Sequence, residues 1–75
     1  MRHIARTALT NLIVRNLVTR VQTALMVRQY YQGPIDGVMG KATPGALMAF
    51  QMDSGLTING RMDTPSFNAL GIKIP

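Results

Sequence analysis

The side chains of this chain that could do acid–base chemistry are three aspartates and one histidine. A glycoside hydrolase needs two carboxylates about 5 to 9 Å apart, one of them with a raised pKa. Asp36, Asp53 and Asp63 are the only candidates, and Asp36 and Asp63 are better explained by turn and helix-capping sequences. His3 has no nearby partner for metal binding or general-base catalysis. The sequence therefore predicts no catalytic residue, no metal site and no cofactor.

Length and charge limit the remaining functions. A chain of 75 residues forms one small domain, and without cysteine it depends on packing alone for stability. Its formal charge of +5 favours a polyanionic partner such as nucleic acid, an acidic lipid surface or an anionic cell wall. Arg15, Arg20 and Arg28 interrupt every window that could span a membrane. The basic N-terminus lacks the apolar region and cleavage site of a signal peptide, so none is predicted.

The first half of the chain has helical periodicity. A stripe of apolar residues at helical spacing predicts a helix from about residue 17 to residue 30. The stripe is formed by Val14, Val18, Val21 and Leu25. Leu9, Leu12 and Ile13 lie about 160° away on the same helical wheel, so we expect a bend between Asn11 and Asn16, or a separate short helix. Residues 1–16 are accordingly predicted to be an N-terminal helical extension or linker, and 17–75 the domain, with Asn16 as an N-cap.

The second half contains an internal repeat. "IDGVMGKATPGAL" (35–47) aligns without a gap with "INGRMDTPSFNAL" (58–70) at an offset of 23 residues, with five of thirteen pairs identical. Each copy is a turn, a helix start and an apolar helix, which indicates one supersecondary unit used twice. Gly40 and Asp63 lie at expected N-cap positions, with Thr43 followed by Pro44 as an alternative start for the first of these helices. Gly55 and Gly71 fit helix ends.

The elements together predict an all-α fold, a small three-helix bundle with two long turn-rich loops at about 31–42 and 55–63. Its expected core consists of Val18, Val21, Leu25, Ile35, Val38, Leu47, Phe50, Leu56, Ile58, Phe67 and Leu70. Such a bundle with a charge of +5 also describes a helix-turn-helix nucleic-acid binder. The helical segment "GALMAFQMD", where a recognition helix would lie, has no basic residue, so no nucleic-acid partner is predicted.

The stretch from Leu17 to Ile72 resembles the peptidoglycan-binding domain family, small three-helix modules attached to bacterial and phage cell-wall hydrolases. The residues that carry the resemblance are Val21, Gln22 and Leu25, then Tyr30, Tyr31, Gly33, Ile35, Asp36, Gly37, Gly40 and Thr43, then Phe50, Gln51, Gly55 and Leu56, and finally Gly60, Asp63, Ser66 and Leu70. The sequence departs from the family pattern at Gln29, where glycine is usual, at Met39, where an aromatic residue is usual, and at Pro44-Gly45.

The resemblance implies a non-catalytic module that binds the glycan or stem peptide of peptidoglycan and targets an attached or partner enzyme to the wall. It implies a location in the bacterial envelope, in the periplasm or cell wall, or a phage-encoded endolysin. The alternative is a protein–protein interaction module of a secretion or envelope complex that docks through the apolar N-terminal "IARTALTNLIV".

Ligand-binding residues are expected on the loops 30–38 and 58–62. The candidates are Tyr30, Tyr31, Gln32, Asp36, Asn59 and Arg61. One tyrosine could pack in the core while the other presents its ring face to a sugar or its hydroxyl to a stem carboxylate, although both could line the core. Arg28 and Arg61 could pair with ligand carboxylates, and Gln22 and Gln51 could instead tie helix ends to loop backbone. The residues with an expected structural role are Gly37, Gly40, Thr43, Gln51, Gly60 and Asp63.

Overall fold

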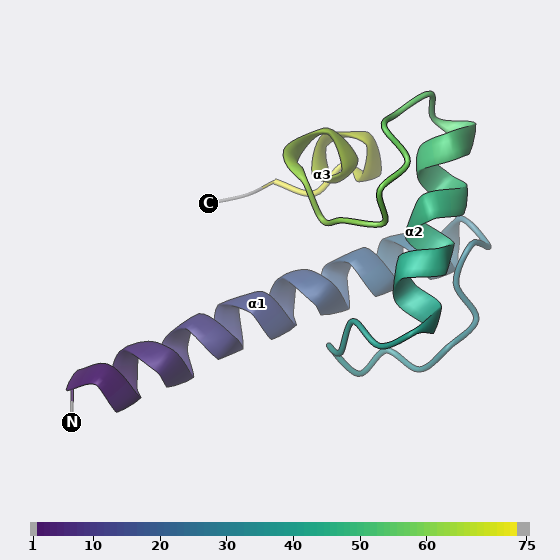
Figure 1. Ribbon diagram of the computed structural model, residues 1–75. Coiled ribbons are helices and arrows are strands. Elements are labelled where there is room, and N and C mark those ends of the chain that lie inside the picture. The colour runs from purple at the N-terminus through teal and green to yellow at the C-terminus, as the bar shows by residue number, and fades with distance from the viewer. Residues whose placement is uncertain (1, 74–75) are drawn as a thin grey trace.

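The fold consists of three helices joined by two long connections. The computed structural model describes the backbone of residues 2–73 and the side chains from residue 9 onward. Helix α1 runs from Arg2 to Val27, α2 from Ala42 to Asp53 and α3 from Thr64 to Leu70, and residues 2–73 contain no strand (Figure 1). The predicted all-α three-helix fold is therefore confirmed. No helix in this part of the chain has both the length and the apolarity to cross a membrane.

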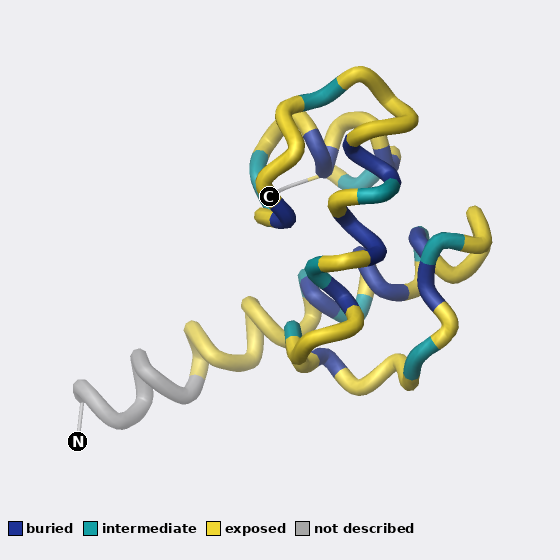
Figure 2. Tube along the Cα trace, turned by 45° about the vertical axis from the view of Figure 1, so that its right-hand side comes forward, coloured by how far each residue is buried: buried dark blue, intermediate teal, exposed yellow. Residues whose placement is uncertain are grey.

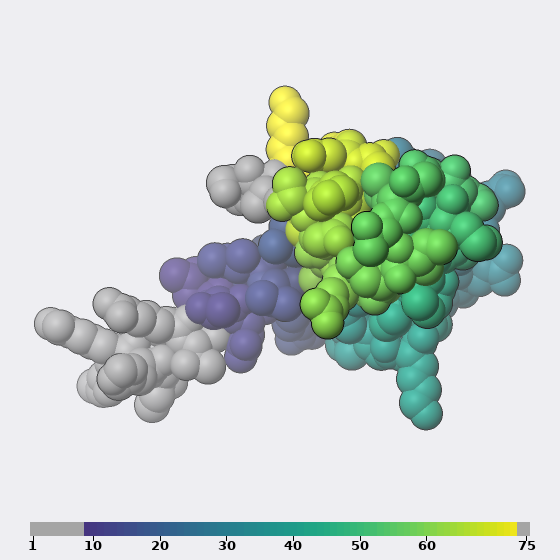
Figure 3. Space-filling view, turned by 45° about the horizontal axis from the view of Figure 1, so that its top comes forward, coloured from purple at the N-terminus to yellow at the C-terminus, as the bar shows by residue number. Residues whose placement is uncertain are grey.

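Helix α1 is a single 26-residue helix, so the predicted bend between Asn11 and Asn16 is wrong. Its first half extends beyond the packed helices, where Leu9 is 59% and Leu12 is 56% exposed (Figures 2 and 3). A change in the apolar face requires a bend only when both stripes must contact the same core. Here only the stripe with Val18, Val21 and Leu25 contacts the core. No glycine or proline lies between residues 2 and 27 to interrupt the helix. Asn16 thus lies within the helix and is not its N-cap.

The core forms where the second half of α1 meets α2 and α3. Seven of the predicted core residues are buried, namely Val18, Val21, Leu25, Leu47, Phe50, Phe67 and Leu70, and Leu56 packs against them half-buried. The prediction is wrong for Ile35, Val38 and Ile58, which are 39%, 53% and 53% exposed. These three residues flank tight turns that contact the helices through backbone groups and through Asp36 and Asn59. Tyr31 and Ala46 complete the buried cluster.

The helix ends follow local chemistry at α3 but not at the start of α2. Asp63 caps α3 as predicted, since its side chain accepts a hydrogen bond from the Ser66 amide, and Gly71 ends it with a φ of 74°. Helix α2 begins after Lys41, which makes no side-chain capping bond, so neither Gly40 nor Thr43 is its N-cap. Pro44 is therefore the third helical residue. A backbone N–H at this position has no acceptor within the helix, so proline removes no helical hydrogen bond there.

Candidate functional site

The side chain of Gln22 holds the first connection against α1. It is fully buried, and its carbonyl oxygen Oε1 accepts hydrogen bonds from the amides of Asp36 (3.2 Å) and Gly37 (3.0 Å). Its amide nitrogen Nε2 lies 2.9 Å from the Val38 carbonyl oxygen and 3.1 Å from both Asp36 Oδ1 and Thr43 Oγ1. One side chain therefore fixes a turn and the first turn of α2 at once.

Gln51 makes the same contacts with the second connection. Its Oε1 accepts from the amides of Asn59 (3.0 Å) and Gly60 (2.9 Å). Its Nε2 lies 2.9 Å from Asn59 Oδ1, 3.2 Å from the Arg61 carbonyl oxygen and 2.9 Å from Ser66 Oγ. We call each buried glutamine, together with the loop and helix atoms that it binds, a glutamine clamp. The expectation that these two glutamines tie helices to loop backbone is confirmed.

The clamps extend the internal repeat to the preceding helices. Gln22 is 14 residues before Asp36, whereas Gln51 is 8 residues before Asn59, so the segment from the glutamine to the turn is six residues longer in the first copy. A search at one fixed offset cannot align the glutamines and the turns together, which is why the 23-residue repeat covers only part of the unit. The duplicated unit is a helix bearing a glutamine, a turn, and the start of the next helix.

The glycine of each turn lies against the helix of its own clamp. Gly37 and Gly60 have φ values of 73° and 67°, which disfavour any residue with a Cβ. A Cβ at Gly37 would lie 3.1 Å from the carbonyl oxygen of Arg15, and one at Gly60 would lie 3.3 Å from that of Pro44. Arg15 and Pro44 each precede their clamp glutamine by seven residues, so both turns pack on their helices in the same way.

The carboxylates of Asp36 and Asp63 make hydrogen bonds within the fold. Asp36 Oδ1 accepts from the Val38 amide at 3.0 Å, and this bond, with the Gln22 amide, lowers the pKa of the carboxyl group. The side chains of Asn59 and Ser66 and the Ser66 amide lower the pKa of Asp63 in the same manner. Lowered pKa values are the opposite of what a general acid needs. Among the described residues no group of three potential metal ligands occurs.

The two tyrosines have different positions. Tyr31 is only 4% exposed and its hydroxyl donates to the Pro34 carbonyl oxygen at 2.6 Å, so the expectation that it contacts a ligand is corrected: its ring belongs to the core. Tyr30 is half-buried, with its ring edge-to-face against Phe50 at a centroid distance of 5.5 Å. The Tyr30 hydroxyl donates to Asp53 at 2.6 Å, and this bond raises the tyrosine pKa.

The predicted ligand residues that remain accessible do not converge on one pocket. Asp36 shares Gln22 with Thr43 in the first turn of α2, whereas Tyr30 is bonded to Asp53, the last residue of that helix. Ten residues of helix separate these positions by about 15 Å along its axis. Gln32, Asn59 and Arg61 are exposed on the two connections. They form a spread surface and not a cavity.

Arg28 is used within the fold. Its guanidinium donates to the carbonyl oxygens of Ala24 (3.1 Å) and Leu70 (3.3 Å). It therefore joins the end of α1 to the end of α3, and it is not the free cation that the sequence suggested for pairing with ligand carboxylates.

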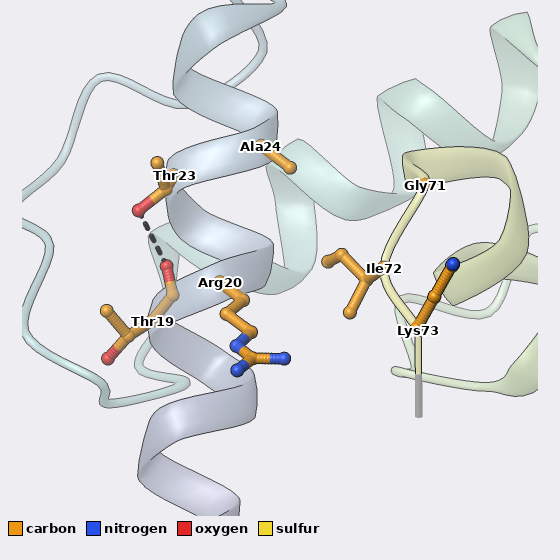
Figure 4. Close-up of a pocket in the computed structure, with 7 residues that line it drawn as sticks. All are labelled: Thr19, Arg20, Thr23, Ala24, Gly71, Ile72 and Lys73. Atoms are coloured by element: carbon orange, nitrogen blue, oxygen red, sulfur yellow. Dashed lines mark hydrogen bonds between the residues drawn. The ribbon is translucent and has the colours of Figure 1, made fainter. Parts of the chain in front are cut away.

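A groove that the sequence reasoning missed lies between α1 and the segment after α3 (Figure 4). It has a volume of about 360 Å³, and its lining residues are Thr19, Arg20, Thr23, Ala24, Gly71, Ile72 and Lys73. We call it the α1–C-terminal groove. Arg20 also lines a smaller adjacent hollow of about 140 Å³ with Ile13, Asn16 and Leu17. No local pattern predicts this groove, because its lining comes from two segments far apart in the sequence, residues 19–24 of α1 and residues 71–73.

Comparison with known proteins agrees with this architecture. The sequence model of the family described as "Putative peptidoglycan binding domain" matches residues 14–70, which include both clamps and all of α2 and α3. "Localization factor PodJL" of Caulobacter vibrioides, found in two strains, is 41% identical over 51 residues. These residues make up 68% of this chain and 5% of the relative. No solved structure matches. The chain belongs to the peptidoglycan-binding domain family.

Proposed function

We propose that this chain is a non-catalytic module that binds peptidoglycan and holds an attached or partner protein, such as a wall hydrolase, at the bacterial cell wall. The observation that carries the proposal is the family match over residues 14–70, which include every residue of the buried core cluster. Because its ligand is the wall polymer, we place the module in the cell envelope.

The charge distribution supports an anionic ligand. The chain carries +5, and the three aspartates are each hydrogen-bonded within the fold. Arg20, Lys41, Arg61 and Lys73 are all exposed. Peptidoglycan carries carboxylates, so long-range attraction draws it to the module before specific contacts form.

The exposed residues of the two connections are the proposed contacts with the wall. Gln32 and Arg61 are exposed, and Tyr30 is half-buried. Asp36 and Asn59 are exposed, each uses Oδ1 within a clamp, and Asn59 Nδ2 donates to Asp63 Oδ2 at 3.0 Å. Together these five residues could supply hydrogen bonds and, through Arg61, one positive charge to the polymer.

Co-sedimentation with purified sacculi tests the proposal. We expect the chain to pellet with sacculi and to stay bound at about 0.2 M salt, because specific contacts survive screening better than charge alone. Arg61→Gln should reduce the bound fraction, whereas Lys41→Gln, which removes the same charge elsewhere, should not. Tyr31 stays unchanged because its substitution would disturb the core. Loss of binding at moderate salt, or an equal affinity for duplex DNA in a gel shift, would refute wall recognition.

A protein-interaction role is the second candidate. The first half of α1 projects from the packed helices, and Leu9, Leu12 and Ile13 are exposed on it (Figure 2). The relative is named a localization factor. In this case residues 1–16 form an extension that contacts another protein. Leu12→Lys should then abolish capture of an envelope protein by the chain while leaving sacculus binding unchanged.

A further inference from the structure

We propose that the α1–C-terminal groove binds the peptide stem of peptidoglycan through its carboxylates. This inference rests on the proposed function and names the part of the polymer that is recognised. The groove lies between the exposed side of α1 and residues 71–73, and it shares no lining residue with the loop residues that the sequence singled out. It is therefore a second contact surface of the module.

The charges of the groove select an anion. Figure 4 shows Arg20 on α1 and Lys73 on the C-terminal segment on opposite sides of Ile72. No acidic residue is among those lining the groove or the adjacent hollow. The guanidinium can bind a carboxylate in bidentate fashion, and the lysine ammonium can neutralise a second one.

The threonine hydroxyls are used within the fold. Thr23 Oγ1 donates its hydrogen to the Thr19 carbonyl oxygen at 2.8 Å, and Thr19 Oγ1 donates to the Arg15 carbonyl oxygen at 2.8 Å. Thr19 Oγ1 also lies 3.0 Å from the position of a Cβ at Gly37, so it faces the first connection, and Figure 4 shows both threonine side chains on the side of α1 away from Ile72. The polar contacts of the groove with a ligand therefore come from Arg20 and Lys73.

The apolar surface of the groove fits small side chains and disfavours a sugar ring. Ala24 and Ile72, both half-buried, are the apolar residues that line it. None of the lining residues is aromatic, so a pyranose ring finds no flat π-face to stack on. A short peptide with alanine methyl groups and free carboxylates matches this surface, and peptidoglycan stems have that composition.

The groove and the adjacent hollow together are long enough for a stem peptide. Arg20 lines both hollows, so the surface continues along α1 from Ile13 to Ala24. Eleven residues of helix span about 16 Å, which an extended peptide of about five residues covers. The groove volume of about 360 Å³ is within the range of small-ligand sites.

An NMR titration with a synthetic stem tetrapeptide tests the inference. The wild-type chain is titrated with the free acid, with the same peptide amidated at every carboxyl group, and with a chitin oligosaccharide. We expect the free acid to shift the backbone amides of Thr23, Ala24, Gly71 and Ile72, and the other two probes to shift them little.

Charge-matched variants separate site binding from general attraction. Arg20→Gln and Lys73→Gln should each weaken binding of the free acid about three- to tenfold, given the modest strength of exposed charge pairs. Arg15→Gln and Lys41→Gln remove the same charge outside the groove and should change the affinity less than twofold. All four side chains are exposed, so circular dichroism should show unchanged folding.

Three outcomes would overturn the inference. Equal effects of the groove variants and their controls, peptide shifts confined to residues near Gln32 and Arg61, or preferential shifts by the oligosaccharide would each exclude a stem site in this groove. If the wild-type chain still sediments with sacculi in such a case, the proposed function stands and only the inference fails. If the wild-type chain does not sediment, the proposed function fails and the inference falls with it.

Discussion

Replacing the clamp glutamines is the sharpest test of how this fold is held together. Gln22→Met and Gln51→Met keep an unbranched side chain of similar length but remove both the acceptor and the donor. Each change leaves the clamped turn without its side-chain partner. The structure predicts that both variants lose stability by similar amounts, because the two clamps make corresponding bonds.

The size of the loss follows from the bonds that are fully buried. In the first clamp these include the bonds of Gln22 with the Gly37 amide and with Thr43 Oγ1, and in the second those of Gln51 with Gly60 and Ser66. An unsatisfied buried polar group costs about 1–3 kcal/mol, so the two groups of each clamp give an expected loss of about 2–6 kcal/mol. The remaining clamp bonds are partly exposed, and water can replace them. The whole free energy of unfolding of a domain of this length is about 4–11 kcal/mol, so either substitution removes a large part of it.

Urea unfolding followed by circular dichroism at 222 nm measures this loss. Gln32→Met is the matched control, since Gln32 is exposed on the first connection, and it should change the free energy of unfolding by less than about 0.5 kcal/mol. A loss below about 1 kcal/mol for both variants would refute the size worked from the buried bonds, and a large loss for only one of them would refute the equivalence of the clamps.

Three further predictions concern single positions. Gln29 has a φ of 67° that favours glycine, so Gln29→Gly should raise the free energy of unfolding by up to about 1 kcal/mol in urea titrations, and a loss would contradict the strain argument. Gly60→Ala should cost about 1–3 kcal/mol by the same assay, since its Cβ would meet Met48 Cγ at 3.2 Å at a positive φ, whereas Gly45→Ala, with open space around it, should not destabilise the chain. The Val38 amide and the Gln22 side chain lower the pKa of Asp36, so the folded state keeps this charge to lower pH than the unfolded state. Stability should therefore fall as the pH drops below the ordinary value of 3.8, and Asp36→Asn should flatten that fall; an unchanged pH profile would refute the contribution of Asp36.

Features governed by neighbours in sequence could be predicted. The cap at Asp63, the helix end at Gly71 and the buried stripe from Val18 to Leu25 all depend on local bonds or on helical spacing. The departure of Gln29 from the family pattern could also be seen in the sequence, and the structure places it at the one described non-glycine position with positive φ. Local chemistry decides such positions whatever the tertiary fold.

Features governed by distant contacts could not be predicted. The exposure of Val38 depends on a turn that directs backbone, not side chain, to Gln22, sixteen residues away. The groove depends on Arg20 and Lys73, which only the path of the chain through α2 and α3 brings together. Helix α1 stayed continuous because its first half has no core to meet, which periodicity alone cannot show.

The clamps also explain why the family motif says more about fold than about ligand. Asp36, Gly37 and Thr43 carry the resemblance, and each is bonded to Gln22 inside the structure. Gly37 and Thr43 are buried, and Asp36 has only its second carboxylate oxygen left with which to bind a wall polymer. Ligand preference must therefore come from side chains that the clamps leave free, and the two turns differ there: the corresponding positions are an exposed valine, Val38, and an exposed arginine, Arg61. The fold thus presents two turns with the same backbone arrangement but with different exposed side chains.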